Sequence, residues 1–552
     1  MATMTSKNAR FMPFGIYTLT SLLILGPLLK SGYILTLDLV FTPTLRMPST
    51  ITSSYLLHAL YRLLNLGVSS QVIEKGVLFS AFLLAGIGTY YLILLLDQTY
   101  TFHRTIGAYI AGLLYIVNPF TYDRFMAGQY NVLLGYALLP WYTRTLLQFI
   151  YDPTVKSAVA LAIWAIITSI VSIHAVGFIV LLTIIALLIN VRQRRREKEW
   201  LTKVLKYGAF TATIFVIASS YWLFPLVLGK SATATSISGY GTNDVAAFAT
   251  VGNGWLGKTL HLLQLQGFWA ESRALYTLPQ AYTPIWSLIS IMIVLLVIGG
   301  AISYWRTGER KTWWLFITVG IFAGIVALGA MNKWVVSHIP LFAGYREPQK
   351  FVALISLAYA VFIARGISAV ISYCHRQGGT FLLICATTLV LLLSVVWTPT
   401  MWWGFNQQLS SAQYPADWFS VNRRLDSDND NFQTLFLPWH LYMFFGFAGR
   451  IIANPASAYF DKPVIVSDNP EFKNISYSNR TPATKQLDQL LPLANKQETL
   501  GRQLAKLNIK YIILENDDDF SNYAYLNRQQ DLKLISKSDT LELYINNAWG
   551  KQ

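Results

Sequence analysis

Cysteine is nearly absent from this sequence, and charged residues are scarce. Cys374 and Cys385 are the two cysteines among 552 residues, which excludes a disulfide framework and a metal site built on cysteine spacing. Charged residues make up 13% of the chain, whereas 54% of it is hydrophobic. No small-residue cleavage site follows the first apolar run, so we expect a retained N-terminal anchor and no cleavable signal peptide.

Long apolar runs dominate what is present. A run of about 20 residues is the length that a helix needs to cross about 30 Å of hydrocarbon. The runs predict a polytopic membrane protein with about eleven transmembrane helices. The expected spans are residues 13–35, 71–96, 105–120, 131–150, 157–173, 175–191, 206–228, 283–305, 313–330, 351–372 and 380–400.

Basic residues are concentrated in the part of the chain that contains these runs. Residues 405–552 carry 15 Lys and Arg against 16 Asp and Glu, whereas residues 1–404 carry 28 against 11. With a cytoplasmic N-terminus, every basic cluster beside the predicted spans falls on the cytoplasmic side, as the positive-inside rule requires. We therefore predict a multi-pass cell-membrane protein with an extracytoplasmic C-terminus. The net charge of +16 reflects this topology and does not indicate a nucleic-acid partner.

Two domains are expected. The first, residues 1–404, is an all-α membrane domain, and the second, residues 405–552, is an extracytoplasmic α/β domain. The membrane domain has four predicted extracytoplasmic loops, at residues 36–70, 118–130, 229–282 and 331–350. In the second domain we expect strands at 434–438, 511–514 and 541–545 and helices at 500–507 and 519–529.

One carboxylate stands alone where the first apolar run ends. Asp38 is the first acidic residue of the chain. A carboxylate just outside the hydrocarbon is readily hydrated, and one that a loop covers could keep its charge and act as a base. The alternative is an interfacial aspartate that only ends a helix.

The second loop begins at Asn118-Pro119, which ends the incoming helix because proline has no N–H donor. Asp123, Arg124 and Gln129 follow closely. They form either a self-paired Asp–Arg turn or a polar cup for a headgroup.

Arg346, Glu347 and Lys350 precede the tenth predicted span, where cations run against the positive-inside trend. Glu347 could pair with one cation and leave the other for a phosphate, or all three could form a structural ion pair. His58 and His174 are further pocket candidates, although a polar helix face and a tight turn explain them as well.

These motifs resemble the GT-C superfamily of polytopic membrane glycosyltransferases. The resemblance rests on Asp38 in the first loop, on Asn118-Pro-Phe with Arg124 and Gln129, and on Arg346-Glu-Pro-Gln-Lys350-Phe. Within the superfamily, the last two motifs look most like YfhO-type proteins and arabinofuranosyltransferases of the AftD type.

The resemblance implies transfer of a sugar from a polyprenyl-phosphate donor to an extracytoplasmic glycan, lipid or protein, with inversion of the anomeric carbon. It assigns the catalytic base to Asp38. The cations Arg346 and Lys350, with Arg124 in reserve, would offset the charge of the leaving phosphate. The second carboxylate that some relatives place beside this aspartate is missing, since Leu37 and Leu39 flank it. We therefore expect no metal and no other cofactor.

Two other functions remain open at this point. A transporter for lipid-linked saccharides would need ionisable residues deep inside the spans and a broken-helix repeat, and neither is apparent. A non-catalytic scaffold or glycan-binding protein would have the same overall pattern of helices and loops. The sequence predicts the glycosyltransferase.

Overall fold

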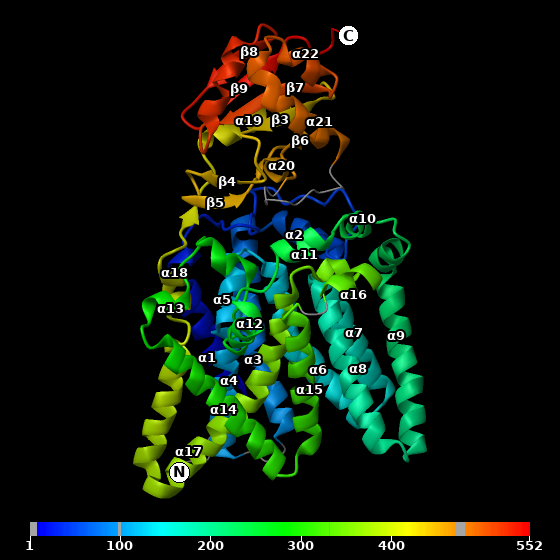
Figure 1. Ribbon diagram of the computed structural model, residues 1–552, viewed down its shortest axis with the longest axis vertical. Coiled ribbons are helices and arrows are strands. Elements are labelled where there is room, and N and C mark those ends of the chain that lie inside the picture. Colours follow the sequence, from blue (N-terminus) through cyan, green and yellow to red (C-terminus); the bar gives the residue numbers. More distant parts are fainter. Residues whose placement is uncertain (1–7, 98–100, 330–331, 340, 470–480, 552) are drawn as a thin grey trace. The chain divides into compact units, whose positions relative to one another are not determined.

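The computed structural model describes residues 8–97, 101–329, 332–339, 341–469 and 481–551 (Figure 1). The chain divides into two compact units. Unit 1 comprises residues 1–27, 48–59 and 76–408, and unit 2 comprises residues 28–47, 60–75 and 409–552. The predicted boundary between residues 404 and 405 stays a prediction. Two N-terminal segments belong to the same unit as the C-terminal residues, which we did not expect.

Long helices make up most of unit 1, and all eleven predicted spans fall on helices. These are α1 (Asn8–Leu25), α3 (Ser70–Leu96), α4 (Phe102–Ile116), α6 (Tyr130–Tyr151), α7 (Val155–Val171), α8 (Ile173–Arg194), α9 (Lys198–Val227), α14 (Trp286–Arg306), α15 (Arg310–Ala327) and α17 (Val352–Val396). The last two predicted spans both lie in α17, whose helical dihedrals break at Gly378 and Gly379. Among the described residues, seven helices are long and apolar enough to cross a membrane, and α7 is a shorter apolar helix. The number of spans therefore stays a prediction.

Glycines let the long helices of unit 1 approach closely. A Cβ atom at Gly300 on α14 would lie 1.8 Å from the carbonyl oxygen of Phe362 on α17. A Cβ at Gly366 on α17 would lie 2.2 Å from the carbonyl oxygen of Leu296. Small residues at such crossings are typical of membrane helices, whose association depends on van der Waals contact. The crossing packs α17, which directly follows the candidate residues Glu347 and Lys350, closely against α14.

Short helices occupy the segments between the long ones. They are α2 (Tyr55–Asn65), α5 (Pro119–Met126), α10 (Ala232–Ser238), α11 (Thr242–Ala247), α12 (Gly254–Leu263), α13 (Pro279–Tyr282), α16 (Asn332–His338), α18 (Trp402–Asn406) and the 3₁₀ helices η1 (Gly26–Leu29), η2 (Trp269–Arg273), η3 (Phe342–Tyr345), η4 (Pro348–Phe351) and η5 (Pro399–Met401). As predicted, the incoming helix α4 ends just before Asn118-Pro119. Asn118 then caps α5 by accepting a hydrogen bond from the N–H of Thr121.

A five-stranded mixed sheet forms the centre of unit 2, in the order β6-β3-β7-β9-β8. Its strands are β3 (Gln433–Leu437), β6 (Val464–Ile465), β7 (Ile509–Glu515), β8 (Leu532–Lys537) and β9 (Leu541–Asn546). β3 runs parallel to β6 and β7, whereas β9 is antiparallel to β7 and β8. The predicted strands at 434–438, 511–514 and 541–545 are confirmed.

The helices of unit 2 are α19 (Ala416–Asp426), α20 (Ala456–Tyr459), α21 (Pro482–Leu490), α22 (Leu500–Ala505), η6 (Leu491–Lys496) and η7 (Phe520–Arg528). The helix predicted at 500–507 is α22, and the one predicted at 519–529 is the 3₁₀ helix η7. Leucines and isoleucines of β3, β7, α21 and α22 pack into one buried core, which includes Leu435, Leu487 and Ile512.

Two small pairings complete unit 2. β1 (Tyr33–Ile34) pairs antiparallel with β2 (Ser411–Ala412), and β4 (Tyr442–Phe445) forms a hairpin with β5 (Arg450–Ala453). The first pairing joins an N-terminal segment to residues almost 400 positions later in the chain. It places Asp38, four residues after β1, within unit 2.

Candidate functional site

A buried network of charged groups in unit 1 contains five of the predicted site residues. We call it the cation cluster. Its members come from four separate elements and are Arg124 on α5, Gln129 before α6, His174 in the first turn of α8, and Glu347 and Lys350 at η4. The side chains of Arg124, Lys350 and Glu347 are 1%, 7% and 10% exposed. Such burial of charge requires that the groups pair with one another.

Glu347 lies at the centre of the cluster and pairs with both cations. Its Oε2 lies 3.2 Å from Nη1 of Arg124, and its Oε1 lies 3.2 Å from Nζ of Lys350. Gln129 closes the network, since its Nε2 donates to Oε2 of Glu347 and its Oε1 accepts from Arg124 at 2.7 Å. Of the two cations beside it in sequence, Arg346 and Lys350, Glu347 pairs with Lys350, and its additional pairing with Arg124 was not predicted.

Burial alone would raise the pKa of Glu347. The ammonium of Lys350 and the guanidinium of Arg124 outweigh this effect and hold its pKa below the ordinary value, so the carboxylate stays ionised. One carboxylate therefore faces two cations.

Several donors near Glu347 have no hydrogen-bond partner among the described residues. These atoms include Nε and Nη2 of Arg124 and Nε2 of Gln349. The guanidinium of Arg124 also lies 4.1 Å from the ring centre of Phe268. Buried donors normally find a partner, and a guanidinium with two unpaired N–H groups can donate hydrogen bonds to an anionic oxygen.

Lys350 makes a second contact, with His174. Its Nζ lies 3.1 Å from Nε2 of the imidazole. The turn that carries His174 is fixed by Tyr345, whose hydroxyl donates to the His174 carbonyl and accepts from the N–H of Gly177. The side chain of His174 thus faces the cluster, while its backbone makes the hydrogen bond in the turn.

Arg346 belongs to a different set of contacts. Its guanidinium lies over the rings of Tyr240 and Phe248, 3.8 Å and 4.7 Å from their centres, and 4.0 Å from Asp244. Tyr240, Asp244 and Phe248 come from the glycine- and serine-rich segment 229–282. Nη1 of Arg346 has no hydrogen-bond partner within the described part of the chain.

Asp123 is buried beside Tyr276 and Glu271. It accepts a hydrogen bond from the hydroxyl of Tyr276 at 3.1 Å. Burial, together with the neighbouring carboxyl of Glu271, raises the pKa of Asp123 well above its ordinary value. Burial beside a second carboxyl therefore disfavours the ionised form of Asp123. We did not predict Glu271 or Tyr276, because nothing in their sequence surroundings marks them.

Asp38 and His58 do not belong to the cation cluster. Asp38 lies in unit 2, where its side chain is exposed and its Oδ1 accepts a hydrogen bond from the hydroxyl of Tyr442 at 2.5 Å. His58 contacts the carbonyl of Ser54 in its own helical turn at 2.8 Å.

An apolar cavity of about 390 Å³ lies among α6, α7, α8 and α9. Its α8 wall begins at Val176, two residues after His174, and continues to Leu187. Tyr142 and Thr183, which are polar lining residues, hydrogen-bond to each other at 2.7 Å. Val180 and Leu205 on its walls are 49% and 65% exposed. The cavity is therefore a hydrophobic groove that shares α8 with the cation cluster.

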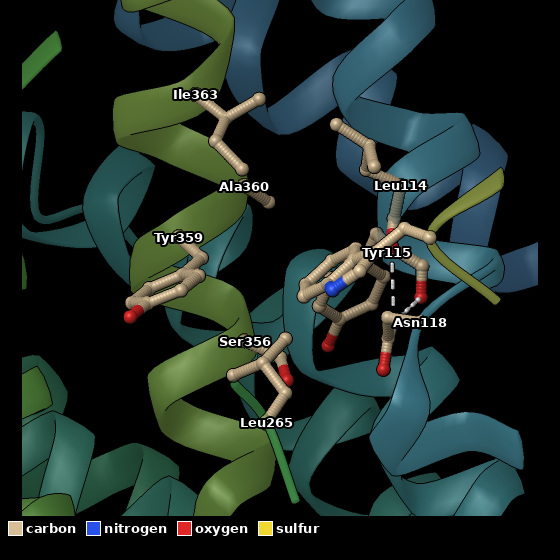
Figure 2. Close-up of a pocket in the computed structure, with 9 residues that line it drawn as sticks. Leu114, Tyr115, Asn118, Leu265, Ser356, Tyr359, Ala360 and Ile363 are labelled. Carbon is tan, nitrogen blue, oxygen red and sulfur yellow. Dashed lines mark hydrogen bonds between the residues drawn. The ribbon is translucent and has the colours of Figure 1, made fainter. Parts of the chain in front are cut away.

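A second cavity lies between α4 and α17 and is much smaller. Figure 2 shows that Leu114, Tyr115 and Asn118 face Ser356, Tyr359, Ala360 and Ile363 across it. Its volume of about 10 Å³ suits at most one water molecule. It is too small to hold a sugar.

No group of three or more His, Cys, Asp or Glu residues is arranged to hold a metal ion in the part of the chain that the structure describes. The three adjacent aspartates at 517–519 make separate contacts with Gly446, Phe444 and His440. That no metal is used stays a prediction.

Comparison with solved structures finds the same fold in the arabinofuranosyltransferase AftD from mycobacteria. One cryo-EM structure matches 99% of this chain with a TM-score of 0.65 at 13% identity. A mutant of that enzyme matches 99% of this chain and 42% of its own, with a TM-score of 0.64 at 13% identity. This chain covers 40% of the first AftD chain, so it is much shorter than that enzyme.

An oligosaccharyltransferase from Archaeoglobus fulgidus in its apo form has a TM-score of 0.45 at 14% identity, over 91% of this chain and 65% of its own. No protein-family model and no curated protein sequence matches this chain. The chain shares its fold with AftD, an enzyme of the type that its motifs resemble. The likeness to YfhO-type proteins stays a prediction.

Proposed function

We propose that this GT-C-like chain is a membrane glycosyltransferase that uses a polyprenyl-phosphate-linked sugar as its donor. The observation that carries the proposal is the buried cation cluster, in which Arg124 keeps two donors without a partner among the described residues. A lipid-phosphate donor needs cations for its headgroup and an apolar surface for its chain. Here His174 on α8 contacts Lys350 in the cation cluster, and Val176 on the same helix lines the apolar cavity.

The cluster supplies positive charge where the phosphate would leave. Arg124 has two buried donors without partners, and Lys350 is held 3.1 Å from His174. In transfer with inversion, an acceptor hydroxyl attacks the anomeric carbon while the bond to the phosphate oxygen breaks. Cations that face the phosphate stabilise the charge that develops on it. Arg346, on its aromatic cradle, is a further candidate for this role.

Asp38 is the proposed base. It would take the proton of the acceptor hydroxyl as the new glycosidic bond forms. Its exposed carboxylate is accessible to an acceptor that approaches from solvent. The acceptor is an extracytoplasmic glycan, lipid or protein, and the predicted topology places Asp38 on that side.

The test uses the native host. A deletion strain is complemented with wild-type protein, with Asp38→Asn, or with Asp430→Asn at matched protein levels, and surface glycans and lipid-linked sugars are quantified. Asp430 is a matched control because it is also an exposed carboxylate of unit 2, and it pairs with Lys510 at 2.7 Å. We expect D38N to lose one sugar from the surface and to accumulate its lipid-linked precursor, as the deletion does, whereas D430N resembles wild type. A normal glycan profile with D38N, where the deletion alters it, would favour a non-catalytic scaffold.

A further inference from the structure

The loop that carries Asp38 is held by the β4–β5 hairpin. Thr36 and Leu39 close a tight turn through two backbone hydrogen bonds, of 3.1 Å and 2.8 Å. Leu37 forms a parallel bridge with Ile452 on β5, and its carbonyl accepts from the N–H of Ala453 at 2.9 Å. The backbone of Leu37 has a φ of 39°, which residues other than glycine seldom adopt without such support.

The register of the hairpin brings Tyr442 to Asp38. Tyr442 on β4 is directly opposite Ala453 on β5, the residue that bonds to Leu37. The hydroxyl of Tyr442 donates to Oδ1 of Asp38 at 2.5 Å. This distance is at the short end of the range for a hydrogen bond to an ionised carboxylate.

The other face of the hairpin fixes its position. Met443 and Phe445 alternate with Tyr442 along β4 and are 1% and 0% exposed, and Ile452 on β5 is fully buried. Phe445 packs against the buried indole of Trp418, with ring centres 6.2 Å apart. Because side chains alternate along a strand, this buried face holds the Tyr442 face in a set orientation.

We propose that Tyr442 is a positioning residue for Asp38 and that the β4–β5 hairpin is part of the catalytic apparatus. The inference rests on the proposed function. The hydroxyl of Tyr442 fixes the orientation in which the carboxylate meets an acceptor hydroxyl, and it stabilises the ionised form that acts as a base. The C-terminal part of the chain thus contributes to the chemistry and is more than an attached binding module.

The experiment measures transfer by purified full-length protein. The donor is the lipid fraction that accumulates in the deletion strain, and the acceptor is the cell-envelope fraction of that strain. Wild type is compared with Tyr442→Phe, Asp38→Asn and the control Tyr511→Phe. Tyr511 also lies in unit 2 and donates to a carboxylate, Asp428, at 2.7 Å.

We expect Y442F to lower kcat by about 10- to 100-fold, as the loss of one orienting contact does, with an unchanged KM for the donor. The acid limb of its pH–rate profile should move to higher pH, because the ionised carboxylate loses a donor. Y511F should match wild type in kcat and in its pH–rate profile. A purely structural role for Tyr442 would lower the amount of folded enzyme without moving the pH profile.

The two proposals fail in different ways. If D38N is inactive but Y442F has the wild-type kcat and pH profile, the positioning role is wrong and the proposed function stands. If D38N has wild-type activity, the chain is a transferase but Asp38 is not its base, and the positioning role of Tyr442 is wrong as well. If the wild-type protein transfers no sugar, the proposed function is wrong.

Discussion

Glu347 is the residue on which the cation cluster depends. It neutralises charge on Arg124 and Lys350 together, and both cations are buried. Removing one partner of a buried pair is costly because it leaves an uncompensated charge out of water. The cost here would apply to two cations at once.

Glu347→Gln should therefore lower the free energy of unfolding by about 3 kcal/mol or more. Glu199→Gln is the matched control, since Glu199 pairs with Lys203 on an exposed helix face and its loss should have no measurable effect. Thermal unfolding in detergent measures the stability of E347Q and of E199Q against wild type. Equal melting temperatures for wild type and E347Q would mean that the cluster does not stabilise the fold.

The stability that Glu347 contributes should depend on pH, and the same variant tests this. The pKa of Glu347 is lower in the folded chain than in the unfolded chain, where it is about 4.3. The ionised group therefore stabilises the fold above that pH, and this stabilisation is lost as the pH falls through the folded-state pKa. The melting temperatures of wild type and E347Q should converge on acidification from pH 7 toward pH 3.

At the level of the element, α8 connects the charged and apolar parts of the proposed site. His174 lies in its first turn, and the cavity-lining residues follow along the same helix. His174 and the cavity-lining residues lie on opposite faces of α8, so a ligand that used both parts would have to pass around the end of this helix.

Ala212→Phe on α9 should fill part of this cavity, because Ala212 is one of the residues that line it. We expect a KM for the lipid-linked donor that is raised about 10-fold, with little change in kcat, since the loss concerns apolar contact with the chain. Thr213→Phe is the control, since Thr213 is the next residue of the helix and does not line the cavity. An unchanged KM for A212F would show that the donor chain binds elsewhere.

Local patterns were sufficient to predict most elements and only part of the site. Apolar runs located the long helices, and Asn118-Pro119 marked the start of α5, because both signals depend on neighbours in sequence. The contact between Arg124 and Glu347 joins residues 223 positions apart, and Tyr276 reaches Asp123 across 153 positions. Such pairs depend on the tertiary fold. β1 and β2 were missed because two-residue strands have no detectable periodicity.

For the whole molecule, the scarcity of cysteine makes the predicted topology testable. Cys374 and Cys385 can be replaced by serine, and single cysteines then introduced at Asn429 in unit 2 and Arg195 between α8 and α9, both of which are exposed. With a cytoplasmic N-terminus, a membrane-impermeant maleimide should label N429C in intact cells and R195C only after permeabilisation. The reverse pattern would place Asp38 on the cytoplasmic side and contradict the proposed acceptor.

The two-to-one ratio of cations to carboxylate in the cluster has a consequence for turnover. Arg124, Lys350 and Glu347 together carry one net positive charge when all three are ionised. A sugar phosphodiester carries one negative charge, so the intact donor is neutralised on binding. The lipid phosphate left after transfer is a monoester whose second ionisation lies near pH 6, which brings its charge close to −2 at neutral pH. A cluster with one net positive charge would therefore neutralise the proposed donor and would leave the spent carrier with about one uncompensated negative charge.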